Sequence, residues 1–174
     1  ESGSLCSCDR CTYARSSAII LYDFCKALHI PVTVYGHSTS GSSVELYSYA
    51  EFESIDNDDK YRMMDIAARG SNRDGAALRF VAEQLVKRPE EVKILILVSD
   101  GQPAAPGYYG SAAEEDLRGI RQEYRRKGVL FIAAAIGEDK QNIERIYGDS
   151  FMDITDLNQL PVKLTAAVKR HMRV

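Results

Sequence analysis

The stretch KILILVSDGQP, residues 93–103, decides the fold. Its apolar run, residues 94–98, is too short to span a membrane and is typical of a β-strand buried on both faces of a parallel sheet. The strand is followed by a carboxylate, Asp100, and a turn. Ligands bind at the carboxyl edge of open α/β sheets because loops there are exposed to solvent yet anchored by rigid strands. We therefore expect Asp100 to lie in a functional site.

Helix and strand patterns alternate on both sides of this stretch. The predicted helices cover residues 14–28, 61–68, 78–85, 111–127, 141–147 and 157–168; the 78–85 segment has apolar residues at i, i+3, i+4 and i+7, and the charged 111–127 segment is closed by Gly128. The predicted strands cover residues 31–36, 44–49, 129–136 and 151–154 in addition to the 93–103 stretch. Only the 44–49 strand follows its predecessor too closely for a crossover, so it is expected to be an antiparallel edge strand. The sequence predicts one α/β domain over residues 1–174, a doubly wound and otherwise parallel sheet.

Composition narrows the classes of partner. The 174 residues are 45% hydrophobic and 27% charged, with a formal net charge of -3. Nothing in this balance favours nucleic acid or an anionic membrane surface, and no apolar run approaches the roughly 20 residues of a membrane span. Four cysteines, three of them clustered, do not form a secreted disulfide framework, so we expect a cytoplasmic protein.

The clustered cysteines, Cys6, Cys8 and Cys11, form a C-x-C-x-x-C pattern. They could hold zinc or a cluster if Cys25, Asp9 or a second chain supplied a fourth ligand. The alternative is that they are structural or redox-labile surface cysteines, because zinc sites usually have two separated pairs.

Three loops rich in small oxygen-bearing side chains are predicted to converge at the Asp100 edge. The first contains Ser2 and Ser4, the second is GSNRDG at residues 70–75, and the third follows Asp100. Hydroxyls, carboxylates and an amide are hard oxygen donors, and the loops offer no histidine. The sequence therefore predicts a site for Mg²⁺ or Mn²⁺. The alternative is that Ser2 and Ser4 cap a helix or turn and that Asp100 bonds only its own loop.

The segments ESGSL, NRDGAAL and ILVSDGQP, in this order, resemble the von Willebrand factor A (VWA) family and its metal-ion-dependent adhesion site. The resemblance implies that Ser2, Ser4 and Asp100 are metal ligands and that a second-loop ligand is Asp74 or Asn72, ranked above Ser71. It also implies that the family's first-loop aspartate lies immediately before Glu1. By the same likeness, a strand outside the given sequence would lie between the 31–36 and 93–103 strands.

Within the family, the segments YARSSAIILYDFCKALHIPVTVYGH and NRDGAALRFVAEQL resemble the bacterial subgroup of nitric oxide reductase activation proteins and the cobaltochelatase subunit. This likeness implies an accessory protein that works beside an AAA+ ATPase. A cation with few charged ligands accepts a further carboxylate, so we expect a carboxylate-bearing protein partner. His37, Tyr108 and Tyr109 are expected on the rim of the partner surface.

An enzyme is the alternative function. A phosphotransfer or hydrolytic α/β enzyme could use Asp100 as nucleophile with the same Mg²⁺. The sequence offers no convincing general base or phosphate-binding lysine near the three loops. The motif GHSTSG, residues 36–41, is not a hydrolase elbow, because Ser40 stands where the elbow needs glycine and the segment leads into a strand.

Overall fold

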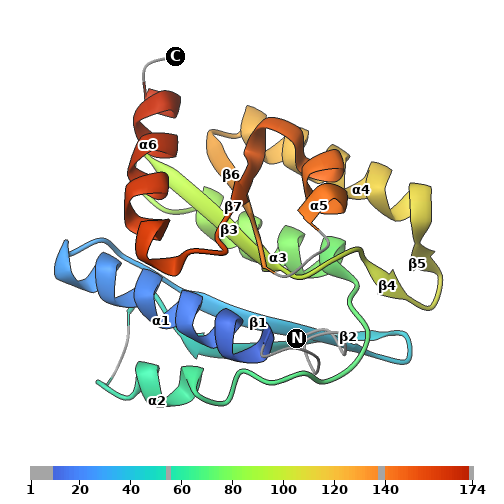
Figure 1. The fold of residues 1–174 in the computed structure, drawn as a ribbon, viewed down its shortest axis with the longest axis horizontal. Coiled ribbons are helices and arrows are strands. Elements are labelled where there is room, and N and C mark those ends of the chain that lie inside the picture. Colours follow the sequence, from blue (N-terminus) through green and yellow to red (C-terminus); the bar gives the residue numbers. More distant parts are fainter. Residues whose placement is uncertain (1–9, 54–55, 137–139, 173–174) are drawn as a thin grey trace.

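A parallel sheet forms the centre of the larger part of the molecule, and a β-hairpin forms the smaller part. The computed structural model describes residues 10–53, 56–136 and 140–172. Strands β3 (Lys93–Ser99), β6 (Val129–Ala135) and β7 (Phe151–Asp153) run parallel in the order β3-β6-β7. All three strands therefore end at one edge, where Asp100 follows β3 (Figure 1).

Helices cover both faces of this sheet, as the doubly wound prediction requires. Helices α3 (Asp74–Val86), α4 (Gly110–Arg126) and α5 (Lys140–Tyr147) share one apolar cluster with the sheet. Helices α1 (Arg10–Ala27) and α6 (Leu160–Met172) approach the opposite face. Successive side chains of a strand point to opposite faces, so alternate residues of β3 enter the two clusters. The α/β fold class is confirmed.

A β-hairpin forms the smaller half of the molecule. Strands β1 (Val34–Ser40) and β2 (Ser43–Ala50) pair antiparallel, with Ser40 opposite Ser43. Gly41 begins the two-residue turn with φ +58°, a conformation that favours glycine and suits tight hairpins. The hairpin, α1 and α2 (Asp59–Met63) enclose a third apolar cluster. The predicted antiparallel strand is confirmed.

Several predicted bounds were wrong. The strand expected over residues 31–36 starts at Val34 and continues to Ser40, because the polar 36–40 segment pairs with β2 up to the turn. The helix expected over residues 61–68 is the shorter α2, since the chain turns after Met63 to bring Ile66 into the same cluster. The C-terminal helix is preceded by a 3-10 turn at Leu157–Gln159, and another such turn, Gly148–Ser150, follows α5. The small pair β4 (Ala104–Ala105) and β5 (Tyr108–Tyr109) was not predicted.

Candidate functional site

Asp100 lies at the carboxyl end of β3, as expected, and is only 4% exposed. Arg10, in the first turn of α1, points its guanidinium at this carboxylate, with Nη1 3.5 Å from Oδ2. The contact brings the N-terminus of α1 to the edge where β3 ends. A buried carboxylate needs such a counter-charge or a cation, because burial without one is costly.

Asn72 fastens the second loop to the loop after Asp100. Its side-chain Nδ2 donates to the carbonyl of Gln102 at 3.1 Å, and its Oδ1 accepts from the backbone N–H of Ala104 at 3.1 Å. Backbone bonds in both directions between Asn72 and Ala104 strengthen the junction. Asn72 is thus a structural link between two of the three predicted loops, and its amide oxygen already accepts a hydrogen bond.

Asp74 is the first residue of α3 and is 4% exposed. The Nε2 atom of His37 lies 2.8 Å from its Oδ1, within hydrogen-bond distance. Asn72 Nδ2 also donates to both Asp74 oxygens, at 3.3 and 3.4 Å. The N-terminus of a helix favours a carboxylate electrostatically, which further stabilises the Asp74 charge. Asp74 is therefore a second buried carboxylate, held in one orientation by β1 and its own loop.

A tyrosine–carboxylate–arginine group packs behind Asp74. Tyr108 donates its hydroxyl to Asp116 Oδ2 at 2.7 Å, and Arg79 binds the other oxygen at 2.5 Å. Burial and the neighbouring carboxylate raise the pKa of Tyr108, while Arg79 lowers the pKa of Asp116. A Cβ on Gly75 would meet the Tyr108 hydroxyl and Asp116 Oδ2, so a larger residue at this position requires these two side-chain ends to shift.

A buried tyrosine completes these surroundings. The hydroxyl of Tyr147 has no hydrogen-bond partner among the described residues. Burial and the charge of Asp74 raise the pKa of Tyr147 well above its ordinary value. Its ring stacks on Phe131 at a centroid separation of 5.4 Å, which fixes its position in the α3–α4–α5 core.

The predicted site residues are only partly gathered by the described structure. Asp100, Asp74 and Asn72 lie at the same edge, whereas Ser2 and Ser4 lie outside the described residues. Within the described ranges, histidine, cysteine and acidic side chains form no group of three that could hold a metal.

The three residues expected on the rim differ in their surroundings. Tyr109 is 69% exposed. Tyr108 is half-buried against Asp116, and the side chain of His37 is turned toward Asp74. The rim prediction therefore rests on Tyr109, and His37 belongs to the carboxylate cluster.

The predicted cysteine cluster is only partly described. Cys6 and Cys8 lie outside the described residues, while Cys11 and Cys25 are free thiols on α1.

The arginines of α4 form ion pairs within and beyond their own helix. Arg118 pairs with Glu114 on the same helix. Arg121 and Arg125 pair with Asp149 in the 3-10 turn that follows α5.

Sequence reasoning missed the contacts made by Arg10, His37 and Asn72. Each joins segments more than 25 residues apart or crosses between two loops, and no local pattern marks such a pairing. The sequence showed only that these side chains are polar. For example, His37 is a polar residue in a strand that also lines an apolar groove. None of the helices in the described part of the chain is both long and apolar enough to cross a membrane.

The fold and the site together define a class: a doubly wound α/β domain with buried carboxylates at the carboxyl edge of its sheet. Residues 58–172, more than half of the chain, match the family described as the cobalamin biosynthesis protein CobT VWA domain. The chain belongs to this family, as the sequence resemblance indicated.

Curated relatives extend the comparison. The chain is 24% identical over 176 residues to uncharacterized protein YojO of Bacillus subtilis (strain 168), covering 93% of the chain and 27% of YojO. It is 34% identical over 97 residues to protein NorD of Brucella suis biovar 1 (strain 1330), covering 54% of the chain and 15% of NorD. It is also 26% identical over 162 residues to uncharacterized protein PA0525 of Pseudomonas aeruginosa, covering 90% of the chain and 26% of PA0525. The chain therefore spans about a quarter or less of the length of these relatives.

Proposed function

We propose that this domain is a divalent-cation-dependent protein-interaction module of an accessory protein. It would recruit a carboxylate-bearing protein partner and work with an AAA+ ATPase in the activation of an enzyme or the insertion of a metallocofactor. Membership of the CobT VWA family and the similarity to NorD support the accessory role. Cobalamin biosynthesis and nitric oxide reductase activation are the two pathways to test first.

The observation that carries the proposal is the pair of buried carboxylates at one sheet edge. Asp100 and Asp74 are each 4% exposed, and Asn72 joins their loops. Hard oxygen donors fit Mg²⁺ or Mn²⁺. Ser2, Ser4, Asp100 and either Asp74 or Asn72 would hold the cation. The bound cation would supply a Lewis-acidic position for an oxygen of the partner, while Arg10 and His37 orient the two carboxylates.

The rim beside this edge supplies the remaining partner contacts. Tyr109 is exposed and lies next to the loop that Asn72 fastens. An exposed aromatic side chain beside a charged anchor is a common arrangement in protein interfaces. The carboxylate of the partner would make binding depend on the cation, and Tyr109 would contribute to the choice of partner.

A capture experiment tests this function. Bait proteins would be the natural chain, Asp100→Ala, and the control Glu115→Ala, an exposed acid on α4. We expect the natural chain and Glu115→Ala to retain the same proteins with Mg²⁺ and to lose them with EDTA. Asp100→Ala should lose them under both conditions. An identical set of captured proteins with and without EDTA would exclude the cation edge as the docking surface.

One contact favours an enzyme as the second candidate function. Arg10 places a guanidinium beside Asp100, and a guanidinium can bind a phosphoryl group. A Mg²⁺-dependent phosphotransfer or hydrolytic enzyme would use Asp100 as its nucleophile. Incubation of the purified protein with phosphate esters separates the two functions. Turnover that disappears in Asp100→Asn would establish the enzyme, and the interaction module predicts no turnover.

A further inference from the structure

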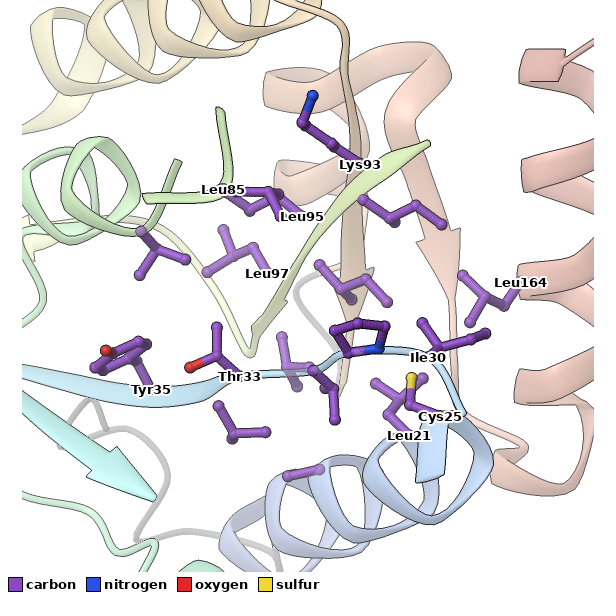
Figure 2. Close-up of a pocket in the computed structure, with 18 of the residues that line it drawn as sticks. Leu21, Cys25, Ile30, Thr33, Tyr35, Leu85, Lys93, Leu95, Leu97 and Leu164 are labelled. Atoms are coloured by element: carbon purple, nitrogen blue, oxygen red, sulfur yellow. The ribbon is translucent and has the colours of Figure 1, made fainter. Parts of the chain in front are cut away.

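The segment GHSTSG, residues 36–41, is polar although most of it lies in β1, and two of its side chains are buried. Ser38 is 2% exposed and Thr39 is 4% exposed. The other end of β1 borders an apolar groove of about 860 Å³, where Figure 2 shows Tyr35 and the preceding Thr33. Burying a hydroxyl is unfavourable unless it forms a hydrogen bond. The two buried hydroxyls therefore need partners, and both have them in the second loop.

Each of these hydroxyls accepts a hydrogen bond from a backbone N–H of the second loop. Ser38 Oγ accepts from the N–H of Gly70 at 2.9 Å, and Thr39 Oγ1 accepts from the N–H of Arg73 at 3.0 Å. Successive side chains of a strand point to opposite faces. The loop is therefore held on both faces of β1 and crosses the strand edge between the two contacts.

The second loop also pairs with the edge of β1 that lies away from β2. The N–H of Thr39 donates to the carbonyl of Ser71 at 2.8 Å, and the N–H of Ser71 donates to the carbonyl of Thr39 at 3.3 Å. Gly70 permits this close approach, because a Cβ there would lie 2.7 Å from the Thr39 carbonyl oxygen. The loop thus contacts β1 on both faces and along one edge.

The same contacts fix the start of α3. Arg73, the residue before the helix, makes no side-chain capping bond. The first N–H groups of a helix have no partner within it, so they depend on a cap or an outside acceptor. Here β1 supplies the contacts: Thr39 accepts from the Arg73 N–H, and His37 Nε2 lies 2.8 Å from Asp74 Oδ1. The position of the Asp74 carboxylate therefore depends on β1.

Backbone pairing continues from the second loop to the rim. Asn72 and Ala104 exchange backbone hydrogen bonds, and Ala104 pairs with Tyr109 between β4 and β5. Together with the pairing of Thr39 and Ser71, these contacts connect β1 to the exposed Tyr109 through the second loop. A change in β1 at Thr39 should therefore reach both the Asp74 loop and the loop after Asp100.

We infer that residues 37–39 of the GHSTSG segment are positioning residues for the edge at which Asp74 and Asp100 lie. Their polar side chains hold the second loop, and Asn72 in that loop holds the residues after Asp100. This role accounts for two buried hydroxyls at the end of β1. The positioning rests on these contacts alone, whereas its consequence for cation binding rests on the proposed function.

Thr39→Val tests the inference, because valine has a similar shape but cannot accept the Arg73 N–H. Hydrogen exchange followed by mass spectrometry would compare this variant with the natural chain. We expect amide exchange in residues 70–74 and 102–105 to become roughly tenfold faster, because a backbone donor loses its acceptor. Residues 129–135 of β6 are the internal control and should keep their exchange rates.

Two further variants separate the hydroxyl from other effects of substitution. Thr39→Ser keeps the acceptor and should restore the natural exchange rates. Thr33→Val removes a hydroxyl that donates to the carbonyl of Ala50 at 2.6 Å, ahead of the same strand, and should leave both loops unchanged. Equal exchange of the two loops in Thr39→Val and Thr33→Val would overturn the inference. Equally faster exchange in β6 would also overturn it, because Thr39 would then stabilise the whole fold.

Calorimetric titration with Mg²⁺ measures the consequence for the proposed site. We expect Thr39→Val to bind Mg²⁺ roughly tenfold more weakly than the natural chain, and Thr39→Ser and Thr33→Val to bind like the natural chain. A natural chain that binds no Mg²⁺ would contradict the proposed function, and the exchange rates would still decide the inference. Mg²⁺ binding that is unchanged in Thr39→Val would overturn the positioning role.

Gly70→Ala tests the contact from the side of the loop. Its Cβ would meet the Thr39 carbonyl oxygen, so the loop and β1 have to move apart. The control is Gly119→Ala on α4, where a Cβ would meet no atom within 4 Å. We expect faster exchange in the two loops for Gly70→Ala and natural rates for Gly119→Ala. Natural rates in both variants would show that the loop does not depend on its contact with β1, and would overturn the inference.

Discussion

β6 and β1 are both seven-residue strands, yet they are buried to very different degrees. β6 has a strand on each side and helices on both faces, and all its residues except Leu130 are buried. Among the described strands β1 pairs only with β2, apart from a bridge between Thr39 and Ser71, and within β1 only Ser38 and Thr39 are buried. β3 lies between these cases, with Leu95 and Leu97 buried and its other residues half-buried. β1 is mostly polar, whereas β3 is apolar like β6 but pairs with only one described strand. The comparison of β3 with β6 therefore indicates that an apolar strand is fully buried only where both of its edges and both of its faces are covered.

The largest expected effect compares two isoleucines that are register partners. Ile132 on β6 is 3% exposed, while Ile96 on β3 is half-buried and lines an apolar groove between β3 and β1. We expect Ile132→Ala to lower the free energy of unfolding by about 3 kcal/mol, because it leaves a closed cavity. Ile96→Ala should cost about 1 kcal/mol in the 174-residue chain, because its site is already open. Urea denaturation of both variants measures the difference, and equal losses would contradict the contrast between the two strands.

A smaller effect concerns the polar contacts of the hairpin half. Tyr22 donates to Asp59 at 2.6 Å in a buried contact, and Asp59 also accepts from Arg62. We expect Tyr22→Phe to cost about 2 kcal/mol, because hydrogen bonds to buried charged groups are stronger than average. The control is Tyr35→Phe, whose hydroxyl contacts Glu51 on the surface at 2.7 Å and should change stability by less than about 0.5 kcal/mol. If thermal unfolding shows similar losses of stability for both variants, burial does not determine how strongly these hydrogen bonds stabilise the hairpin half.

The smallest effect is a pH dependence at the end of β7. Burial raises the pKa of Asp153, but hydrogen bonds from Thr155 and Lys140 outweigh it and lower this pKa from 3.8 to about 2. A depressed folded pKa means that Asp153 stabilises the fold above the unfolded pKa and loses this contribution as the pH falls through the folded one. We expect Asp153→Asn to flatten the stability curve between about pH 4 and pH 2 by less than about 1 kcal/mol, since the side chain is partly solvated. If the free energy of unfolding depends on pH in the same way for Asp153→Asn and for the natural chain, Asp153 is not the source of this pH dependence.

The sequence was a good guide to elements with strong periodicity. The continuous apolar runs in residues 94–98 and 129–136 predicted two buried strands, and the residue patterns of α3 and α4 predicted two helices, at approximately the right positions. These predictions succeeded because each pattern is local in the sequence. Bounds were missed where tertiary contacts decide them. β1 continues to Ser40 because β2 lies opposite, and Asn72 supports β4 from a loop distant in sequence.

The site was predictable in its residue types but not in its contacts. Asp100 and Asp74 could be placed near one edge, since carboxyl ends of parallel strands and the start of a following helix meet there. The pairing of Asp74 with His37 and of Asp100 with Arg10 depends on how β1 and α1 pack against β3. Local patterns carry no information about that packing.

Calorimetric titration with Mg²⁺ and Mn²⁺ tests the proposed cation site most directly. The natural chain would be compared with the double variant Asp100→Ala and Ser4→Ala, and with Glu115→Ala as the control. We expect the natural chain and the control to bind one cation, and the double variant to bind none while keeping its circular dichroism spectrum and cooperative unfolding. The fold should survive because Asp100 follows the end of β3 and belongs to none of the three apolar clusters. Unchanged affinity in the double variant would contradict the assignment of the cation to this edge.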